Sequence, residues 1–370
     1  MRIGVDASRT TARWRTGTEG YSLHLIRELL CLGTKHRLRL YFNQAPPPGL
    51  FAAGAEMRIM PFPRLWTHAR LSWEMALRPP DLLFVPSHVL PVVHPQRSVS
   101  TVHDLGFLYY PESHTAFQNA YLRWSTRYNG RSAACVVADS QATRQDLVRH
   151  YQIDATKITV IYPGRDESIA QVTDPDILAD LRARLGLAER YLLHVGTLHA
   201  RKNLVRLVEA FAGALPDLLP GTQLVLAGRK GWLHDDIMAR VRQLGLEDRV
   251  IFPGYVPSAD LPALLSGAIA FVFPSLYEGF GFPVIEAMAC GVPVVCSGTS
   301  SLPEVAGEAA LFVDPLDTAA LSQAIRRVAS EEPLRRSLVE RGWQQAGRFS
   351  WRRCARQVLD LLEEVGREAV

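Results

Sequence analysis

The stretch PSLYEGFGFPVIEAMACGVPVV, residues 274–295, decides the fold class of this chain. It begins where the apolar run Ala268–Pro274 ends, and that run is expected to be a buried strand. A glycine-rich loop follows, then a helix over Pro283–Cys290 and a second apolar strand at Pro293–Ser297. A strand, a helix and another strand in this order predict a parallel sheet that is covered by helices. Ligands bind at the carboxyl ends of such strands, so we expect the loop at 275–282 to lie at a binding site.

The same alternation of apolar strands and helices runs through the rest of the chain. Many strands are continuously apolar rather than alternating, which is typical of parallel strands buried on both faces. We therefore predict an α/β protein with two doubly wound halves. The expected strands are Arg2–Ala7, Arg37–Phe42, Leu82–Pro86, Ser98–His103, Ala134–Ala138, Ile158–Ile161, Tyr191–Gly196, Gln223–Gly228, Val250–Pro253, Ala268–Pro274, Pro293–Ser297 and Ala310–Val313.

A length of 370 residues predicts two domains. The polar stretch between Pro163 and Arg184 breaks the strand period and is predicted to be a linker. Its Asp174-Pro175-Asp176 resembles a metal-binding D-x-D, but it lacks a flanking strand and is interpreted as part of that linker. We expect an N-terminal domain over residues 1–165, a C-terminal domain over 166–348 and a final amphipathic helix over 349–370.

The composition excludes several classes of protein. Hydrophobic residues make up 48% and charged residues 21%, which is typical of a globular chain and not of a disordered one. A net charge of +4 is too small to indicate nucleic acid binding. No run of about 18 uncharged apolar residues predicts a membrane span, and charges at residues 2 and 6 argue against a signal peptide. The five cysteines form no CxxC pair, which favours free thiols and a cytoplasmic location.

Residues 251–303 contain only three charged side chains, Asp260, Glu278 and Glu286. Gly279 and Gly281 allow the backbone to approach a ligand closely, and the following helix start favours an anion such as phosphate. The two glutamates can then accept hydrogen bonds from hydroxyl groups of the same ligand. The alternative is that Glu286 is a solvated helix residue and Glu278 a turn residue. We favour the binding role, because a buried carboxylate without a partner is costly.

A second anion-binding signal lies in Gly196–Asn203, which also follows a strand and opens a helix. The adjacent cations Arg201 and Lys202 can neutralise a diphosphate there. Basic residues near helix starts are also common on surfaces, so this signal is weak by itself. The prediction of an anion site at Gly196–Asn203 is stronger when the loop at 275–286, which gives a second such signal, is considered with it.

These segments carry a family resemblance. Gly196–Leu204, Pro274–Val295 and Ser301–Gly307 resemble the signature of the retaining, nucleotide-sugar-dependent glycosyltransferases of family 4, also called group 1. Glu278 and Glu286 match the E-x7-E motif of that family. The resemblance implies the GT-B fold, in which two Rossmann-like domains face each other across a cleft. It also implies a donor site in the C-terminal domain, an acceptor site mainly in the N-terminal domain, and a last helix that crosses back to the N-terminal domain.

The resemblance also implies roles for particular residues. Lys202 would contact the donor diphosphate, with Arg201 substituting for a family arginine that is absent at Thr197. Glu278 would bind the transferred sugar, and Glu286 would bind the ribose. The implied donor-binding residues are Gly17, Arg201, Lys202, Tyr255, Glu278, Gly279, Phe280, Gly281, Phe282 and Glu286, and the implied catalytic residues are His103, Lys202 and Glu278.

The N-terminal half offers less specific signals. His103 ends an apolar strand, where it can hydrogen-bond a sugar hydroxyl or move a proton, or simply pack in a loop. The basic loop with Arg9, Arg13 and Arg15 either meets a phosphorylated acceptor or is a surface loop. In Phe117–Arg131, a stripe of aromatic residues is predicted to be core. An arginine row beside it is either a solvated face or a membrane-facing one.

From these features we expect a retaining hexosyltransferase that builds a bacterial surface polysaccharide. Overall similarity to mannosyltransferase-like members favours mannose or a related sugar from a GDP-sugar. The acceptor is expected to be a glycan or a polyprenyl-linked glycan, at the cytoplasmic face of the inner membrane, without a cofactor, an essential metal or nucleic acid. The alternatives are a UDP- or ADP-glucose-dependent transferase of the sucrose or glycogen type, and an inactive partner that binds a sugar nucleotide.

Overall fold

The computed structural model describes residues 1–12, 17–51, 54–87, 89–229, 231 and 234–367. The chain divides into two compact units. The first consists of Met1–Gly164 together with Phe349–Val370, and the second of Arg165–Arg348. Each unit is built around its own parallel sheet.

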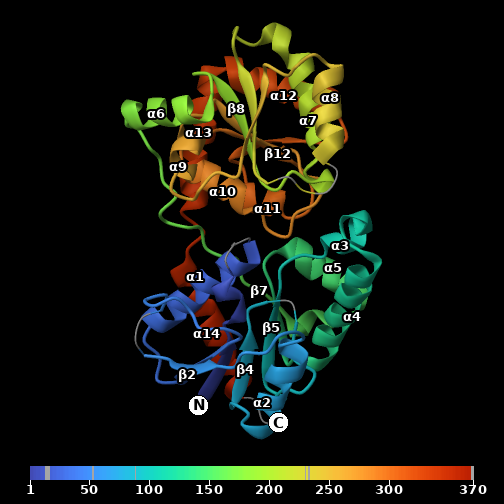
Figure 1. Ribbon diagram of the computed structural model, residues 1–370, viewed down its shortest axis with the longest axis vertical. Coiled ribbons are helices and arrows are strands. Elements are labelled where there is room, and N and C mark those ends of the chain that lie inside the picture. Colours follow the sequence, from blue (N-terminus) through green and yellow to red (C-terminus); the bar gives the residue numbers. More distant parts are fainter. Residues whose placement is uncertain (13–16, 52–53, 88, 230, 232–233, 368–370) are drawn as a thin grey trace. The chain divides into compact units, whose positions relative to one another are not determined.

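The first unit is a parallel sheet with strand order β3-β2-β1-β4-β5-β6-β7 among its described residues. Figure 1 shows α1 and α14 on one side of this sheet and α4 and α5 on the other. Its strands are β1 (Arg2–Asp6), β2 (Arg37–Phe42), β3 (Glu56–Ile59), β4 (Leu82–Val85), β5 (Ser98–Val102), β6 (Cys135–Ala138) and β7 (Ile158–Val160). Its α-helices are α1 (Gly17–Cys31), α2 (Ser72–Leu77), α3 (Gly106–Tyr109), α4 (Ala116–Ser132), α5 (Gln141–Tyr151) and α14 (Trp351–Arg367).

The second unit is a parallel sheet with strand order β10-β9-β8-β11-β12-β13 among its described residues. In Figure 1, α7, α8 and α12 lie along one face and α9, α10 and α13 along the other. Its strands are β8 (Tyr191–Val195), β9 (Gln223–Ala227), β10 (Val250–Gly254), β11 (Ala270–Phe273), β12 (Val294–Ser297) and β13 (Ala310–Val313). Its α-helices are α6 (Pro175–Leu185), α7 (Leu204–Ala214), α8 (His234–Gln243), α9 (Leu261–Ser266), α10 (Phe282–Ala289), α11 (Leu302–Ala306), α12 (Thr318–Ser330) and α13 (Glu332–Ala346).

The predicted fold class of two doubly wound parallel sheets is confirmed. Every expected strand is present, with ends that differ by at most two residues. Their continuous apolar runs are buried, as in β4 and β11, because helices cover both faces. One strand that we did not predict is β3, whose residues Glu56–Ile59 are mostly exposed at the sheet edge.

The predicted linker is wrong over Pro175–Leu185, which forms helix α6. Asp174 caps this helix by accepting hydrogen bonds from the backbone N–H groups of Asp176 and Ile177, at 2.9 and 3.4 Å. Pro175 lies in the first turn, where its missing N–H costs nothing. The Asp174-Pro-Asp176 motif therefore forms the start of a helix. Its polar residues are equally typical of a loop, which is why we predicted a linker there.

The predicted core role of the aromatic stripe in Phe117–Arg131 is wrong at two positions. Phe117 and Trp124 of α4 are 80% and 46% exposed. The buried side of this helix consists of small polar residues instead, among them Ser125, Thr126 and Asn129. The other two aromatic residues of the stripe, Tyr121 and Tyr128, are partly buried, and Tyr128 packs against the core of the first unit.

The last helix, α14, belongs to the first unit. Its first residue, Trp351, packs against the rings of Tyr21 and His24 in α1, with ring centroids 5.6 and 5.4 Å apart. The chain thus returns from the second sheet to the first. None of the helices in the described part of the chain is long and apolar enough to cross a membrane.

Candidate functional site

The strand order of the second sheet creates a crevice between β8 and β11. From β8 the chain moves outward to β9 and β10, and it then returns to β11 and moves outward on the other side. The loops that follow β8 and β11 therefore separate at the carboxyl edge of the sheet, which is where open α/β sheets bind ligands. Arg201 and Lys202 follow β8 in the short helix η5 (Ala200–Lys202), and Glu278 follows β11.

These three predicted residues meet in one cluster. The Nζ atom of Lys202 donates to Oε1 of Glu278 at 2.5 Å. Nη1 of Arg201 donates to Oε2 of the same carboxylate at 3.3 Å and to the carbonyl oxygen of Tyr277 at 2.5 Å. Glu278 is 7% exposed, so a buried carboxylate is held between two cations. We call Arg201, Lys202 and Glu278 the cation cluster.

Charge interactions dominate the electrostatics of Glu278. Burial by itself would raise the pKa of this carboxyl, but Lys202 and Arg201 outweigh burial and lower the pKa to about 2. The carboxylate is therefore ionised at every physiological pH. The cluster carries one net positive charge, which attracts an anion such as a diphosphate.

Two serines fix the backbone of the loop that holds Glu278. The N–H of Glu278 donates to Oγ of Ser300 at 2.9 Å. Oγ of Ser301 donates to the carbonyl oxygens of Glu278 and Phe280, at 3.0 and 2.7 Å. We did not assign a role to either serine from the sequence. Their signal was the polar Thr299-Ser-Ser301, which follows β12 after one glycine, and β12 is the strand that pairs with β11.

Helix α10 begins immediately beyond this loop. Its N-cap, Gly281, has φ +112°, and a Cβ atom there would come within 2.8 Å of Leu302 Cδ2. A glycine is therefore required by both conformation and space. The helix has no side-chain cap, and Pro283 lies in its first turn. This places the positive end of the helix dipole directly after the loop of the cation cluster.

Glu286 lies within α10 and is partly buried. Among the described residues, no hydrogen bond or ion pair joins it to the cation cluster. Burial, and secondly the negative charge of Asp166, raise the pKa of this carboxyl to about 7. Burial and Asp166 therefore destabilise the ionised form of Glu286. Hydroxyl groups of a ligand that donate hydrogen bonds to this carboxylate would stabilise its ionised form.

A prediction follows for Glu286→Gln. The raised pKa of Glu286 costs stability that grows as pH rises from 4.5 through 7, because the folded state must give up a proton that it binds tightly. The variant should be more stable than the wild type at pH 8, by about 3 kcal/mol, and nearly equally stable around pH 4.5. Urea unfolding at the two pH values measures this difference. If the variant is less stable than the wild type at pH 8, Glu286 has a stabilising partner and our interpretation is wrong.

His194, to which we assigned no role from the sequence, lies close enough to the cation cluster to feel the charge of Lys202. It is fully buried in β8, and its ring stacks on Phe273 with centroids 5.3 Å apart. Burial, and secondly the charge of Lys202, lower the pKa of His194 to about 3, so the ring is neutral. Nζ of Lys202 lies 4.6 Å from the centre of the Phe273 ring. A histidine inside the apolar strand Tyr191–Val195 was the available signal.

Tyr255 directly follows β10 and is half exposed. Its ring lies under the guanidinium of Arg229, 5.0 Å from the ring centre. Because β10 runs parallel to β9, and β9 parallel to β8, Tyr255 follows its strand at the same sheet edge as the cation cluster. Its predicted contact with a nucleobase stays a prediction.

His103 lies in the first unit, at the carboxyl end of β5. Its Nδ1 is 2.6 Å from Oδ2 of the buried Asp139, and its Nε2 is 3.3 Å from the carbonyl oxygen of Pro86. Burial opposes a charge on the ring, but Asp139 outweighs it and raises the pKa of His103. Both nitrogens face acceptors, so the ring is fixed in place as a hydrogen-bond donor. A catalytic role for His103 stays a prediction.

The other predicted residues of the first unit follow β1 in the sequence. Gly17 is the first residue of α1. Arg9 lies 3.8 Å from Glu19, between Nη1 and Oε1. Arg13 and Arg15 lie outside the described residues. Gly17 belongs to a different unit from the cation cluster, so its contact with donor phosphates stays a prediction.

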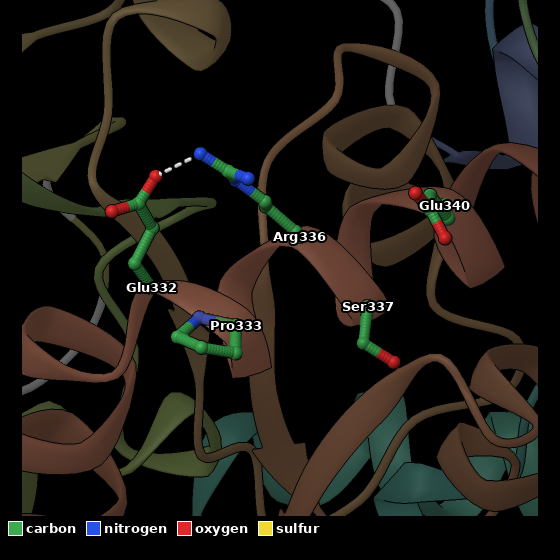
Figure 2. Close-up of a pocket in the computed structure, with 5 residues that line it drawn as sticks. All are labelled: Glu332, Pro333, Arg336, Ser337 and Glu340. Atoms are coloured by element: carbon green, nitrogen blue, oxygen red, sulfur yellow. Dashed lines mark hydrogen bonds and ion pairs between the residues drawn. The ribbon is translucent and has the colours of Figure 1, made fainter.

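A surface hollow of about 350 Å³ lies on α13. Figure 2 shows the side chains that line it. Its size falls within the range of ligand pockets, but its chemistry does not suit a sugar nucleotide. Among the described residues its lining comes from one helix, and the one cation in that lining, Arg336, is ion-paired with Glu332. We do not assign a ligand to it. The lining residues are Glu332, Pro333, Arg336, Ser337 and Glu340.

No group of three or more His, Cys, Asp or Glu side chains within the described ranges could hold a metal ion.

Comparison with solved structures identifies the fold. Sucrose-phosphate synthase from Thermosynechococcus elongatus is 22% identical, with a TM-score of 0.76 over 98% of each chain. Anabaena HepE in complex with UDP and glucose is 21% identical, with a TM-score of 0.76 over 98% of this chain and all of the other. The fold is that of the GT-B glycosyltransferases.

Sequence comparison identifies the family. The model "Glycosyl transferases group 1" matches residues 180–345, and the model "Glycosyltransferase Family 4" matches residues 15–169. O-antigen chain mannosyltransferase B of Escherichia coli is 34% identical over 266 residues, which are 72% of this chain and 70% of that protein. The chain therefore belongs to the group 1 glycosyltransferases of family 4.

Another relative is much longer than this chain. The serotype-specific mannosyltransferase WbdA of Escherichia coli is 27% identical over 275 residues, and the match spans 33% of its length. The matched 72% of this chain thus corresponds to about a third of that protein.

Proposed function

We propose that the chain transfers a mannosyl or related hexosyl residue from a GDP-sugar to a glycan or lipid-linked acceptor during assembly of a bacterial surface polysaccharide. The observation that carries the proposal is the cation cluster, where Lys202 and Arg201 meet one carboxylate at the switch point of the sheet. The donor sugar is chosen from relatives named as O-antigen mannosyltransferases. N-acetylgalactosaminyl transfer to a diphospho-undecaprenol glycan is named for another relative, which supports a lipid-linked acceptor.

The proposed reaction breaks the bond between the sugar C1 and the diphosphate oxygen. Negative charge grows on the departing diphosphate, where Lys202, Arg201 and the start of α10 would stabilise it. The acceptor hydroxyl forms the new bond to C1 on the same face, and its proton passes to the departing oxygen. Glu278 is held by two cations and serves to orient hydroxyl groups rather than to attack C1. This route retains the anomeric configuration and needs neither a cofactor nor a metal.

A UDP-glucose donor is the second candidate. It is favoured by the complex of Anabaena HepE with UDP and glucose, which shares the fold at 21% identity. An inactive binding partner is disfavoured, because the cation cluster is complete in this chain.

A thermal-shift panel of UDP-, GDP-, ADP- and dTDP-sugars tests the donor assignment. A ligand at 100 times its Kd stabilises a protein by about 2.7 kcal/mol, so the true donor should raise Tm by about 5 °C. We expect GDP-mannose to give the largest shift and adenosine alone, as the control, to give none. If UDP-glucose shifts Tm most, the second candidate is correct. If no sugar nucleotide shifts Tm, the proposal is wrong.

A further inference from the structure

Helix α4 presents two kinds of side chain on its outer face. Phe117 and Trp124 are exposed and lie one above the other along the helix. Arg123, Arg127 and Arg131 form a parallel row at spacings of four residues, and all three are exposed. The helix thus offers large apolar rings beside a line of fixed positive charges.

Contacts between rings join this face to neighbouring segments. Nε2 of His68, in the short helix η2 (Thr67–Leu71), lies 2.7 Å from the hydroxyl of Tyr121. Trp124 packs against His68 and stacks on Tyr128, with ring centroids 5.4 and 5.5 Å apart. The hydroxyl of Tyr128 donates to the carbonyl oxygen of Val92 at 2.8 Å. The start of η2 and the loop 91–93 therefore lie directly beside α4.

The neighbouring segments also expose apolar side chains. Val92 and Val93 are about half exposed, and Trp73 at the start of α2 is 63% exposed. The N–H of Val93 donates to Oγ of Ser72 at 3.3 Å, which ties α2 to the loop. We call the exposed faces of α4, of η2 with α2, and of loop 91–93 the aromatic–arginine surface. Exposed apolar groups gathered in this way indicate an interaction site.

The charged side chains of this surface are almost all positive. The segments 57–80, 89–102 and 116–132 contain eight arginines and a single acidic residue, Glu74. Glu74 is 2% exposed and is ion-paired with Arg58 and Arg70. No carboxylate from these segments is therefore exposed, although the whole chain is nearly balanced at +4.

We propose that the aromatic–arginine surface docks on an anionic lipid bilayer. Tryptophan and phenylalanine are favourable at the boundary between headgroups and acyl chains, and arginines beside them attract anionic headgroups. A second copy of the chain would place like charges against each other, which disfavours self-association through this surface. A soluble polyanion would use the arginines but leave the apolar rings in water.

The experiment measures binding of the full chain to lipid vesicles by co-sedimentation. One set of vesicles contains phosphatidylcholine alone, and the other contains equal parts of phosphatidylcholine and phosphatidylglycerol. Arg127→Glu and Trp124→Ser test the surface, and Phe117→Ser replaces Trp124→Ser if the latter does not fold. The matched controls are Arg242→Glu and Trp343→Ser in the second unit, since Arg242 is exposed and Trp343 is 45% exposed.

We expect binding only to the vesicles with phosphatidylglycerol, and we expect it to weaken with added salt. Arg127→Glu and Trp124→Ser should each weaken binding about tenfold, while both controls bind like the wild type. The proposal is overturned if the wild type does not bind at low salt or binds both vesicle types equally. It is also overturned if the controls weaken binding as much as the test variants. Binding to dextran sulfate that depends on Arg127 but not on Trp124, without vesicle binding, would identify a polyanion site instead.

Discussion

Lys202→Met is expected to lower kcat/KM for sugar transfer by about 10³-fold. The ammonium lies in a buried cluster at the switch point of the sheet, where a charge stabilises a departing diphosphate far better than it would in water. Methionine keeps an apolar stem of similar length against Phe273 but removes the charge. Most of the loss should appear in kcat, because the negative charge on the diphosphate grows in the transition state. Steady-state kinetics with the sugar nucleotide that stabilises the protein most would measure this effect.

The control for this variant is Lys35→Met, since Lys35 is an exposed lysine in the first unit. It should transfer sugar as fast as the wild type. If Lys202→Met keeps kcat/KM within about threefold of the wild type, Lys202 does not contact the reacting groups.

Glu278→Gln is expected to reduce both activity and stability. Activity should fall by about 10²-fold, because the amide no longer orients sugar hydroxyls as a charged acceptor. The free energy of unfolding should fall by about 3 kcal/mol at pH 7, since Lys202 and Arg201 lose their buried partner. The lowered pKa of Glu278 contributes stability that is fully present above about pH 4.5. The difference between variant and wild type should therefore narrow as pH falls from 4.5 toward 2, which urea unfolding would measure.

Glu308→Gln is the matched control, because Glu308 is an exposed glutamate in the same unit. It should change neither stability nor activity. Combining Glu278→Gln with Lys202→Met should restore part of the lost stability, since the unpaired ammonium is then absent. A Glu278→Gln variant that is as stable as the wild type at pH 7 would contradict the ion pairs described here.

The strands that could be predicted from the sequence are those that are buried in the sheet. Strands such as Tyr191–Val195 are covered on both faces, so an apolar run identifies them. Strand β3 lies at the sheet edge and has only Glu56-Met-Arg-Ile59 to indicate it, so no apolar run exists. Helix α6 was mistaken for a linker because its polar first turn, at Asp174 and Pro175, resembles a loop.

The site was predictable in its residue types but not in its geometry. Sequence motifs indicated Arg201, Lys202 and Glu278, but only the structure shows both cations on one carboxylate. The carboxylate that holds His103 comes from Asp139, 36 positions away, and only the pairing of β5 with β6 brings them together. The raised pKa of Glu286 depends on burial and on Asp166, and neither is visible in a local pattern.

The central claim is that the cation cluster binds the diphosphate of a sugar nucleotide. A crystal structure of the protein with the nucleoside diphosphate of its preferred donor tests this claim most directly. We expect phosphate oxygens within about 3 Å of Lys202 Nζ and of the Arg201 guanidinium, and ribose hydroxyls on the Glu286 carboxylate. A diphosphate bound elsewhere, with Lys202 and Arg201 contacting only Glu278, would contradict it.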